Sequence, residues 1–488
     1  MSNTDSRRVL WTFIVSGIAI FMVSLDNLVV FNALPTIRTE LHTGLDGLQW
    51  IINSYTLTEA VLLLAGASLG DRFGRKRTFV AGLVIFTAAS AACALSSSIG
   101  LLIAARAVQG VGAAIVIPLT LTLLAQAVPP AKRGAAIGMW SAMSGLAVGL
   151  GPVVGGAITN YASWQWIFWI NVPIGVVLVP LAIALVGESF GTSARLDLVG
   201  NALIALGLLG IVFGLIRGND HGWTSAGVLG SLIGGALLLA VFVAWINRVS
   251  EPMVPPVIFT SRGFTLTALA ALGMSVGMFG AVFFLVQFLQ SAQHYSALSA
   301  GVHTLAWTAM PTFTAPIAGI LIDRIGGKPV LVVGLVLQAI GLGWLAAVTT
   351  PDVSYAVLVP SFVISGAGMG LFFPPIARLA LEYVAPQFEG VASGVSSAIR
   401  YFGTVLGIAV LGAVFAAHGS YANPRTFTDG YVPALWWACA FLTVSAIVAI
   451  LLPRRPERAG SGAPAAAETA TAAAAETAAD APETVTAR

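Results

Sequence analysis

The sequence is poor in charge and in cysteine. Only 9% of its 488 residues are Asp, Glu, Lys or Arg, whereas 57% are apolar. Because a soluble domain carries about 25% charged residues, this composition excludes an ordinary soluble protein. The two cysteines, Cys93 and Cys439, lie within apolar runs. We therefore predict no disulfide framework and interpret both as small packing side chains.

Long apolar runs are what the sequence does contain. A helix needs about 20 apolar residues to cross a hydrocarbon core of about 30 Å. Runs of this length recur fourteen times, and 53 glycines suit close helix packing in lipid. The first run follows two arginines, as in a signal peptide, but lacks a small-residue cleavage site, so we expect it to be retained. The sequence thus predicts an all-α membrane protein with spans near 10–31, 48–70, 78–97, 100–124, 133–158, 166–186, 196–216, 226–246, 264–289, 297–321, 329–349, 355–376, 391–417 and 431–452.

The basic residues predict the orientation. With the N-terminus inside, 18 of the 23 Lys and Arg residues fall in inside segments, three (Arg38, Arg217 and Arg425) fall outside, and two lie within spans. Cytoplasmic loops carry such an excess of positive charge. We therefore expect a multi-pass protein of the inner (plasma) membrane with both termini in the cytoplasm.

Two loops share a pattern that indicates an internal repeat. Residues 70–77 read Gly-Asp-Arg-Phe-Gly-Arg-Lys-Arg, and residues 322–328 read Ile-Asp-Arg-Ile-Gly-Gly-Lys. Transporters are often built from such repeats. The predicted layout is a cytoplasmic N-terminus (1–9), a six-helix bundle (10–190), an inserted helix pair (191–250), a second six-helix bundle (251–455) and a disordered cytoplasmic tail (456–488).

Five stretches carry a resemblance to a known family. They are Leu25-Asp26 with Ala33-Leu34-Pro35, the loop from Asp71 to Lys76, the run from Arg106 to Gly112, the glycines Gly138, Gly151, Gly155 and Gly156 with Pro152, and the run from Trp166 to Gly175. Together they resemble the major facilitator superfamily, within it the fourteen-span drug:proton antiporter branch. Departures from its pattern are Leu28, Phe31, Ala67, Ala147 and Gln165, of which Leu28 and Phe31 bear on the cargo.

The resemblance implies a proton-driven exporter of drugs, antibiotics or similar amphipathic compounds that works by alternating access. It also implies gating roles for two sets of residues. The first set, a latch on the cytoplasmic side, is Asp71, Arg72, Gly74 and Arg75, in which Gly74 permits a tight turn. The second set, which controls switching of the fifth helix, is Gly151, Pro152, Gly155 and Gly156.

Away from the ends of the predicted spans, four charged residues lie within them: Asp26, Glu59, Arg106 and Arg400. An ionisable side chain at membrane depth is costly and marks a functional site by default. Burial and a neighbouring guanidinium act on a carboxylate in opposite directions. We hypothesise that Asp26 or Glu59, coupled to Arg106, binds and releases the driving proton; a static Asp26–Arg106 pair is the structural alternative.

The cargo cavity is expected between the two bundles near the midplane, where transporters of repeat architecture bind. Flexible Met and aromatic walls accept varied ligands. The candidates that supply polar groups from the first bundle are Asn27, Asn53, Tyr55 and Gln109. Those that supply a mainly apolar surface from the second bundle are Met274, Met278, Phe279, Phe283, Gln287 and Phe372. Arg400 is a further candidate, which could face an anionic group of the cargo or a backbone carbonyl.

Other functions are less consistent with the sequence. A primary pump would need a phosphate-binding G-x-x-x-x-G-K-[ST] loop, and an enzyme a recognisable catalytic or metal motif; neither pattern occurs. We expect no enzyme activity, cofactor, metal or nucleic-acid partner, and a monomer that meets its cargo, protons and lipids. A dedicated exporter, or a proton symporter, of one metabolite is the remaining alternative.

Overall fold

The computed structural model describes residues 3–129, 132–191, 197–250 and 252–453. Within these ranges, fourteen helical segments are long and apolar enough to cross a membrane, which confirms the predicted number and the all-α class. The tail predicted at 456–488 lies outside the described residues.

The helices fall into three consecutive groups. The N-terminal group contains α1 (Asn3–Glu40), α2 (Leu45–Phe73), α3 (Arg75–Ala94), α4 (Ile99–Ala127), α5 (Arg133–Tyr161), α6 (Trp166–Trp169) and α7 (Asn171–Leu185). The middle pair is α8 (Leu198–His221) and α9 (Ala226–Ile246). The C-terminal group contains η2 (Pro256–Thr260), α10 (Arg262–Gln287), η3 (Phe288–Ala292), α11 (Ala297–Thr308), α12 (Met310–Ile325), α13 (Gly327–Val348), α14 (Tyr355–Gly370), α15 (Phe373–Glu382), η4 (Pro386–Phe388), α16 (Glu389–His418) and α17 (Pro424–Ile450).

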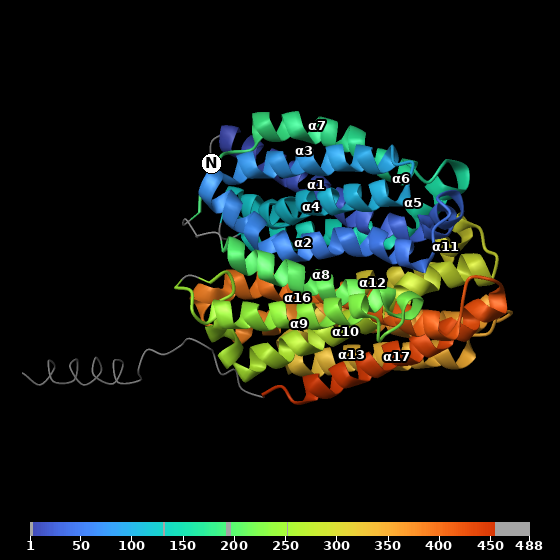
Figure 1. Cartoon of the computed structure of the whole chain (residues 1–488). Coiled ribbons are helices and arrows are strands. Elements are labelled where there is room, and N and C mark those ends of the chain that lie inside the picture. The colour runs from blue at the N-terminus through green and yellow to red at the C-terminus, as the bar shows by residue number, and fades with distance from the viewer. Residues whose placement is uncertain (1–2, 130–131, 192–196, 251, 454–488) are drawn as a thin grey trace, which may run out of the picture.

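The long helices run roughly alongside one another, with the N-terminal group in the upper part of Figure 1 and the C-terminal group in the lower part. α8 lies at the level where the two groups meet, and α9 overlaps the C-terminal group in this view. α8 packs against α9, α2 and α16, and α2 also packs against α16. We call the end of the molecule where α1 begins the near end, and the other the far end. The boundaries predicted for the two bundles and the inserted pair stay predictions.

Three predicted spans are not single helices. The spans predicted at 166–186, 297–321 and 355–376 are each divided, into α6 and α7, α11 and α12, and α14 and α15. Proline has no N–H to donate to the carbonyl four residues earlier. Pro173, Pro311 and Pro374 therefore leave the carbonyls of residues 169, 307 and 370 without this bond, close to where each preceding helix ends. These breaks were not predicted, because the apolar length of a run does not reveal them.

The two repeated loops form the same kind of turn at the near end. Gly74 joins α2 to α3 with φ of 103°, and Gly326 joins α12 to α13 with φ of 83°. These angles lie in the region that residues with a Cβ rarely adopt. The tight turn predicted at Gly74 is confirmed, and the second loop repeats it.

Glycines also let helices touch along their backbones. A Cβ placed on Gly66 of α2 would lie 2.4 Å from the carbonyl oxygen of Ala114 in α4. In lipid, where apolar contact gives no drive for helix association, such close packing supplies much of the attraction.

We expect Gly66→Leu to separate α2 from α4 and to lower the free energy of unfolding by about 1–3 kcal/mol, as overpacking does. Gly230→Leu is the matched control, because Gly230 of α9 has open space where a Cβ would stand. Thermal unfolding of the two purified variants in detergent checks this. Equal unfolding temperatures would contradict the close packing of α2 on α4.

Candidate functional site

A buried ion pair joins α1 to α4. Asp26 Oδ2 lies 2.6 Å from Arg106 Nη1, and both side chains are fully buried. Asp26 Oδ1 accepts hydrogen bonds from Gln109 Nε2 at 2.9 Å and from Asn171 Nδ2 at 2.7 Å. The carboxylate of Asp26 is therefore held by three donors from α4 and α7, and buried charges are tolerated when they are paired in this way.

Arg106 has further partners. Its Nε donates to the carbonyl of Ile51 at 3.3 Å, and its guanidinium lies 4.0 Å from the centre of the Tyr55 ring. The network thus extends to α2, and a bond from Asn171 to Ser90 extends it to α3. Sequence analysis had Asp26, Arg106, Gln109 and Tyr55 among its candidates but missed Asn171, although this residue stands in the run from Trp166 to Gly175 that carries the family resemblance.

Glu59 lies apart from this network. Its side chain is fully buried in α2. Neither carboxylate oxygen has a hydrogen-bond partner in the described part of the chain. The side chains of Tyr401 in α16 and Asn27 in α1 are its polar neighbours and are placed to donate to it, although neither forms a hydrogen bond of good geometry. Glu59 therefore stands where the N-terminal group meets α16, and Tyr401, which no sequence pattern marked, faces it.

Other polar groups of α2 are also buried without a partner. Both side-chain polar atoms of Asn53 and the hydroxyl of Tyr55 lack hydrogen bonds to any residue the structure describes. Nearly all buried polar groups in proteins are satisfied, so each exception calls for an explanation such as water or a ligand. Asn53 and Tyr55 were predicted to line the cargo cavity, and their unmet polarity is compatible with that role.

The predicted cavity residues of the C-terminal group are packed among helices. Phe283 meets Phe31 of α1 edge-on, with ring centres 6.4 Å apart, and so lies between the two groups. Gln287 accepts a hydrogen bond from the hydroxyl of Tyr421. Phe279 is half-buried, and the fully buried members of this set are Met274, Met278, Phe283, Gln287 and Phe372. Their assignment to a cavity stays a prediction.

Arg400 is a half-buried cation in α16. Its Nη2 donates to the hydroxyl of Ser397 at 3.3 Å, and its guanidinium lies 5.9 Å from the Phe373 ring centre. Across the ranges that the structure covers, no carboxylate forms an ion pair with it. Arg400 thus remains available to an anionic or carbonyl group.

The predicted latch residues form a compact structure at the near end. Asp71 and Arg75 are joined across the Gly74 turn by an ion pair of 2.6 Å. The chain after α7 docks onto this turn, because Arg75 N donates to the carbonyl of Ser189 at 2.8 Å and Glu188 accepts from Lys76 N at 2.9 Å. Sequence analysis missed Glu188, whose charge favours the N-terminus of α3. Arg72, the fourth predicted latch residue, lies over the ring of Phe73.

The glycines of α5 face two different helices. A Cβ on Gly155 would lie 2.7 Å from the carbonyl oxygen of Val29 in α1, and one on Gly151 would meet Leu28. On the other side, a Cβ on Gly156 would lie 2.4 Å from the carbonyl oxygen of Ala297 in α11. The second gating set therefore packs α5 against both its own group and the C-terminal group, and Pro152 accepts a bond from Asn32 of α1.

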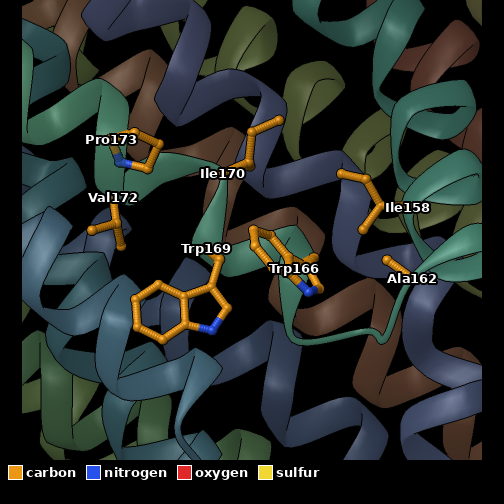
Figure 2. Close-up of a pocket in the computed structure, with 7 residues that line it drawn as sticks. All are labelled: Ile158, Ala162, Trp166, Trp169, Ile170, Val172 and Pro173. Atoms are coloured by element: carbon orange, nitrogen blue, oxygen red, sulfur yellow. The ribbon is translucent and has the colours of Figure 1, made fainter.

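A groove of about 500 Å³ lies on the outer surface near the far ends of α5, α6 and α7. Figure 2 shows the indoles of Trp166 and Trp169 between Val172 and Pro173 on one side and Ile158 and Ala162 on the other. Tryptophans gather where a membrane meets water. None of the predicted cavity residues lines this groove.

Known proteins resemble this chain along most of its length. It is 35% identical over 414 residues to the multidrug resistance protein Stp of Mycobacterium tuberculosis (strain CDC 1551 / Oshkosh), covering 84% of this chain and 77% of the relative. It is 32% identical over 424 residues to the tetracenomycin C resistance and export protein of Streptomyces glaucescens, covering 86% and 79%.

The fold also matches solved structures. The crystal structure of a D-xylose-proton symporter superposes with a TM-score of 0.66 at 14% identity, covering 92% of this chain and 98% of the symporter. The sequence profile of the Major Facilitator Superfamily matches residues 16–288 and 267–481. The chain belongs to the Major Facilitator Superfamily, and it is a membrane transporter rather than an enzyme.

Proposed function

We propose that this transporter is a proton-driven antiporter that exports drugs, antibiotics or similar small amphipathic compounds by alternating access. Two of its relatives carry names that describe multidrug resistance and the export of an antibiotic. The proposal extends this kind of cargo to the present chain and adds the proton as the driving ion.

The observation that carries the proposal is the state of Glu59. An ionised carboxylate that is buried without hydrogen bonds is costly. A proton removes that cost, and so does the cationic part of a cargo molecule. Because Glu59 of α2 faces α1 and α16, it lies where the two groups meet, and we propose that proton and cargo reach it there when the groups move apart. Competition of proton and cargo for one carboxylate is what exchange requires.

Asp26 is suited to a different role. Its carboxylate has three donors, among them the guanidinium of Arg106, so neither a proton nor a cargo is needed to satisfy it. Of the two carboxylates that the sequence left as candidates, we propose that Glu59 carries the exchange. Asp26 then holds Arg106, whose positive field reaches Glu59.

Alternating access is supported by where the two groups touch. At the far end, Gln49 Nε2 of α2 donates to the carbonyl of Ile408 in α16 at 2.6 Å, and Arg38 lies 4.1 Å from the centre of the Tyr421 ring. We propose that this closed far end faces the outside and that the near end, with the beginning of α1, the end of α17 and the Asp71 turn, faces the cytoplasm.

We expect Glu59→Gln to abolish uptake of a fluorescent cationic dye driven by a pH gradient in everted vesicles, because glutamine cannot exchange a proton. Dye binding without a gradient is expected to weaken as well. Asp352→Asn, which alters an exposed carboxylate at the far end, serves as the control and is expected to transport normally. Full gradient-driven transport by a normally expressed Glu59→Gln variant would refute the role of Glu59.

Asp26→Asn is expected to lower the free energy of unfolding by about 3–5 kcal/mol, because it leaves the charge of Arg106 buried without its counter-ion. Glu59→Gln is expected to unfold at or above the wild-type temperature, since it removes a charge that has no partner. Thermal unfolding of both variants in detergent makes the comparison. The reverse order of stability would show that Glu59, and not Asp26, is the structural carboxylate.

The orientation can be tested with single cysteines in a chain that carries Cys93→Ser and Cys439→Ser. We expect Asp352→Cys to react with a membrane-impermeant maleimide in intact cells, because positive charge keeps the near end inside. Arg324→Cys, beside the Gly326 turn, should react only after permeabilisation. Labelling of Arg324→Cys in intact cells would place the near end outside.

A further inference from the structure

A second groove, of about 540 Å³, lies where the middle helix pair meets the contact between α2 and α16. Its floor is formed by small and apolar side chains, among them Ala60 and Leu64 of α2 and Ala398 of α16. Its outer wall is formed by α9 and by the segment 253–260 that leads to α10. The groove extends from the near end to about the level of Ala60.

The groove is separate from the proposed exchange site. Val61, which lines it, follows Glu59 by two positions and so points about 200° away around the helix. The contact between α2 and α16 stands in between and is tight, because a Cβ on Gly394 would lie 2.3 Å from Cδ2 of Leu64. Ala60, which directly follows Glu59, also lines the groove, but the groove and the Glu59 carboxylate lie on different faces of α2.

The groove is continuous with the apolar surface that faces lipid. Val243 and Phe259 line it and are 55% and 37% exposed, respectively. An apolar chain from the bilayer can thus enter it sideways without crossing a polar layer. The residues of α2 and α16 that line the deep part of the groove are all apolar. This part therefore suits a hydrocarbon chain and provides no hydrogen-bonding side chain for a polar ligand.

The mouth at the near end has a different chemistry. Asn247 and Thr260 line the groove there. Arg248 directly follows Asn247, Arg262 is two positions after Thr260, and both arginines are exposed. Neither takes part in an ion pair with another residue that the structure describes. Segment 247–262 contains one acidic residue, Glu251, which lies outside the described ranges, so its formal charge is +1.

We propose that this groove binds an anionic phospholipid of the leaflet at the near end. One acyl chain lies along Ala60, Leu64 and Ala398, and the phosphate lies against Arg248 and Arg262. Basic pockets between membrane helices on the cytoplasmic side bind anionic headgroups. The buried carboxylate of Asp197 lies behind the lining residue Met253, whose backbone N–H donates to it, whereas the guanidinium groups of Arg248 and Arg262 are the exposed charges beside the mouth. These guanidinium groups disfavour the cationic cargo proposed above, and this inference does not depend on what the protein transports.

The test uses the full-length protein purified in detergent. Native mass spectrometry measures the retention of phosphatidylglycerol and of phosphatidylcholine with identical acyl chains, added separately. We expect tighter retention of phosphatidylglycerol. Arg248→Ala combined with Arg262→Ala should lower that preference by about fivefold for each arginine removed. Arg324→Ala, an exposed arginine of the same end, should leave the preference unchanged.

Ala398→Phe provides the second arm, because a phenyl ring fills the groove and leaves both arginines in place. We expect it to reduce retention of both lipids. Equal retention of the two lipids by the wild-type protein, or an undiminished preference in the double arginine variant, would overturn the proposal. The proposal would also be overturned if Ala398→Phe abolished the retention of a cationic dye but left the retention of phosphatidylglycerol unchanged. The groove would then be a cargo site.

Discussion

The ion pair between Asp26 and Arg106 is the interaction on which the N-terminal group depends. In lipid, apolar side chains give helices no reason to prefer one another over the solvent. A buried guanidinium gives them such a reason, because its donors need acceptors; in Arg106 only Nη2 finds none among the described residues. Arg106 takes a carboxylate from α1 and a backbone carbonyl from α2, while Asn171 brings in α7. Four helices are thus placed by polar geometry, and their glycines then permit the close approach that this geometry demands.

The C-terminal group is held together in another way. Phe284 stacks on Phe415 with ring centres 4.7 Å apart, and Phe288 lies 5.3 Å from Tyr431. These rings connect α10, α16 and α17 without any ionised group. The two groups therefore share a topology and a turn but differ in what stabilises them. Of the four charged residues well inside the spans, Asp26, Glu59 and Arg106 belong to the N-terminal group, whereas Arg400 is the one from the C-terminal group.

The sequence predicted the features that follow from the order of apolar and charged residues along the chain. The number of spans follows from apolar length, and Asp26 and Arg106 were conspicuous because so few ionisable residues lie within the spans. Asn171, Tyr401 and Glu188 were not predicted, because a neutral or loop residue shows its role only when the rotation and tilt of its helix are known. The divided spans could have been predicted only from the positions of prolines such as Pro311, each of which leaves a carbonyl of the preceding turn without a donor.

The contact between α5 and α11 has a mechanical consequence. Gly156 faces the backbone of Ala297, and Gly301 faces the backbone of Pro152. Two main chains that meet at glycines have no interlocking side chains to disengage, so one can roll over the other without any rotamer having to change. A helix contact of this kind permits rolling and small tilts of one helix on the other. In the proposed alternating access, the two groups would tilt about the far end along this contact at little energetic cost, because their distance of approach can stay constant.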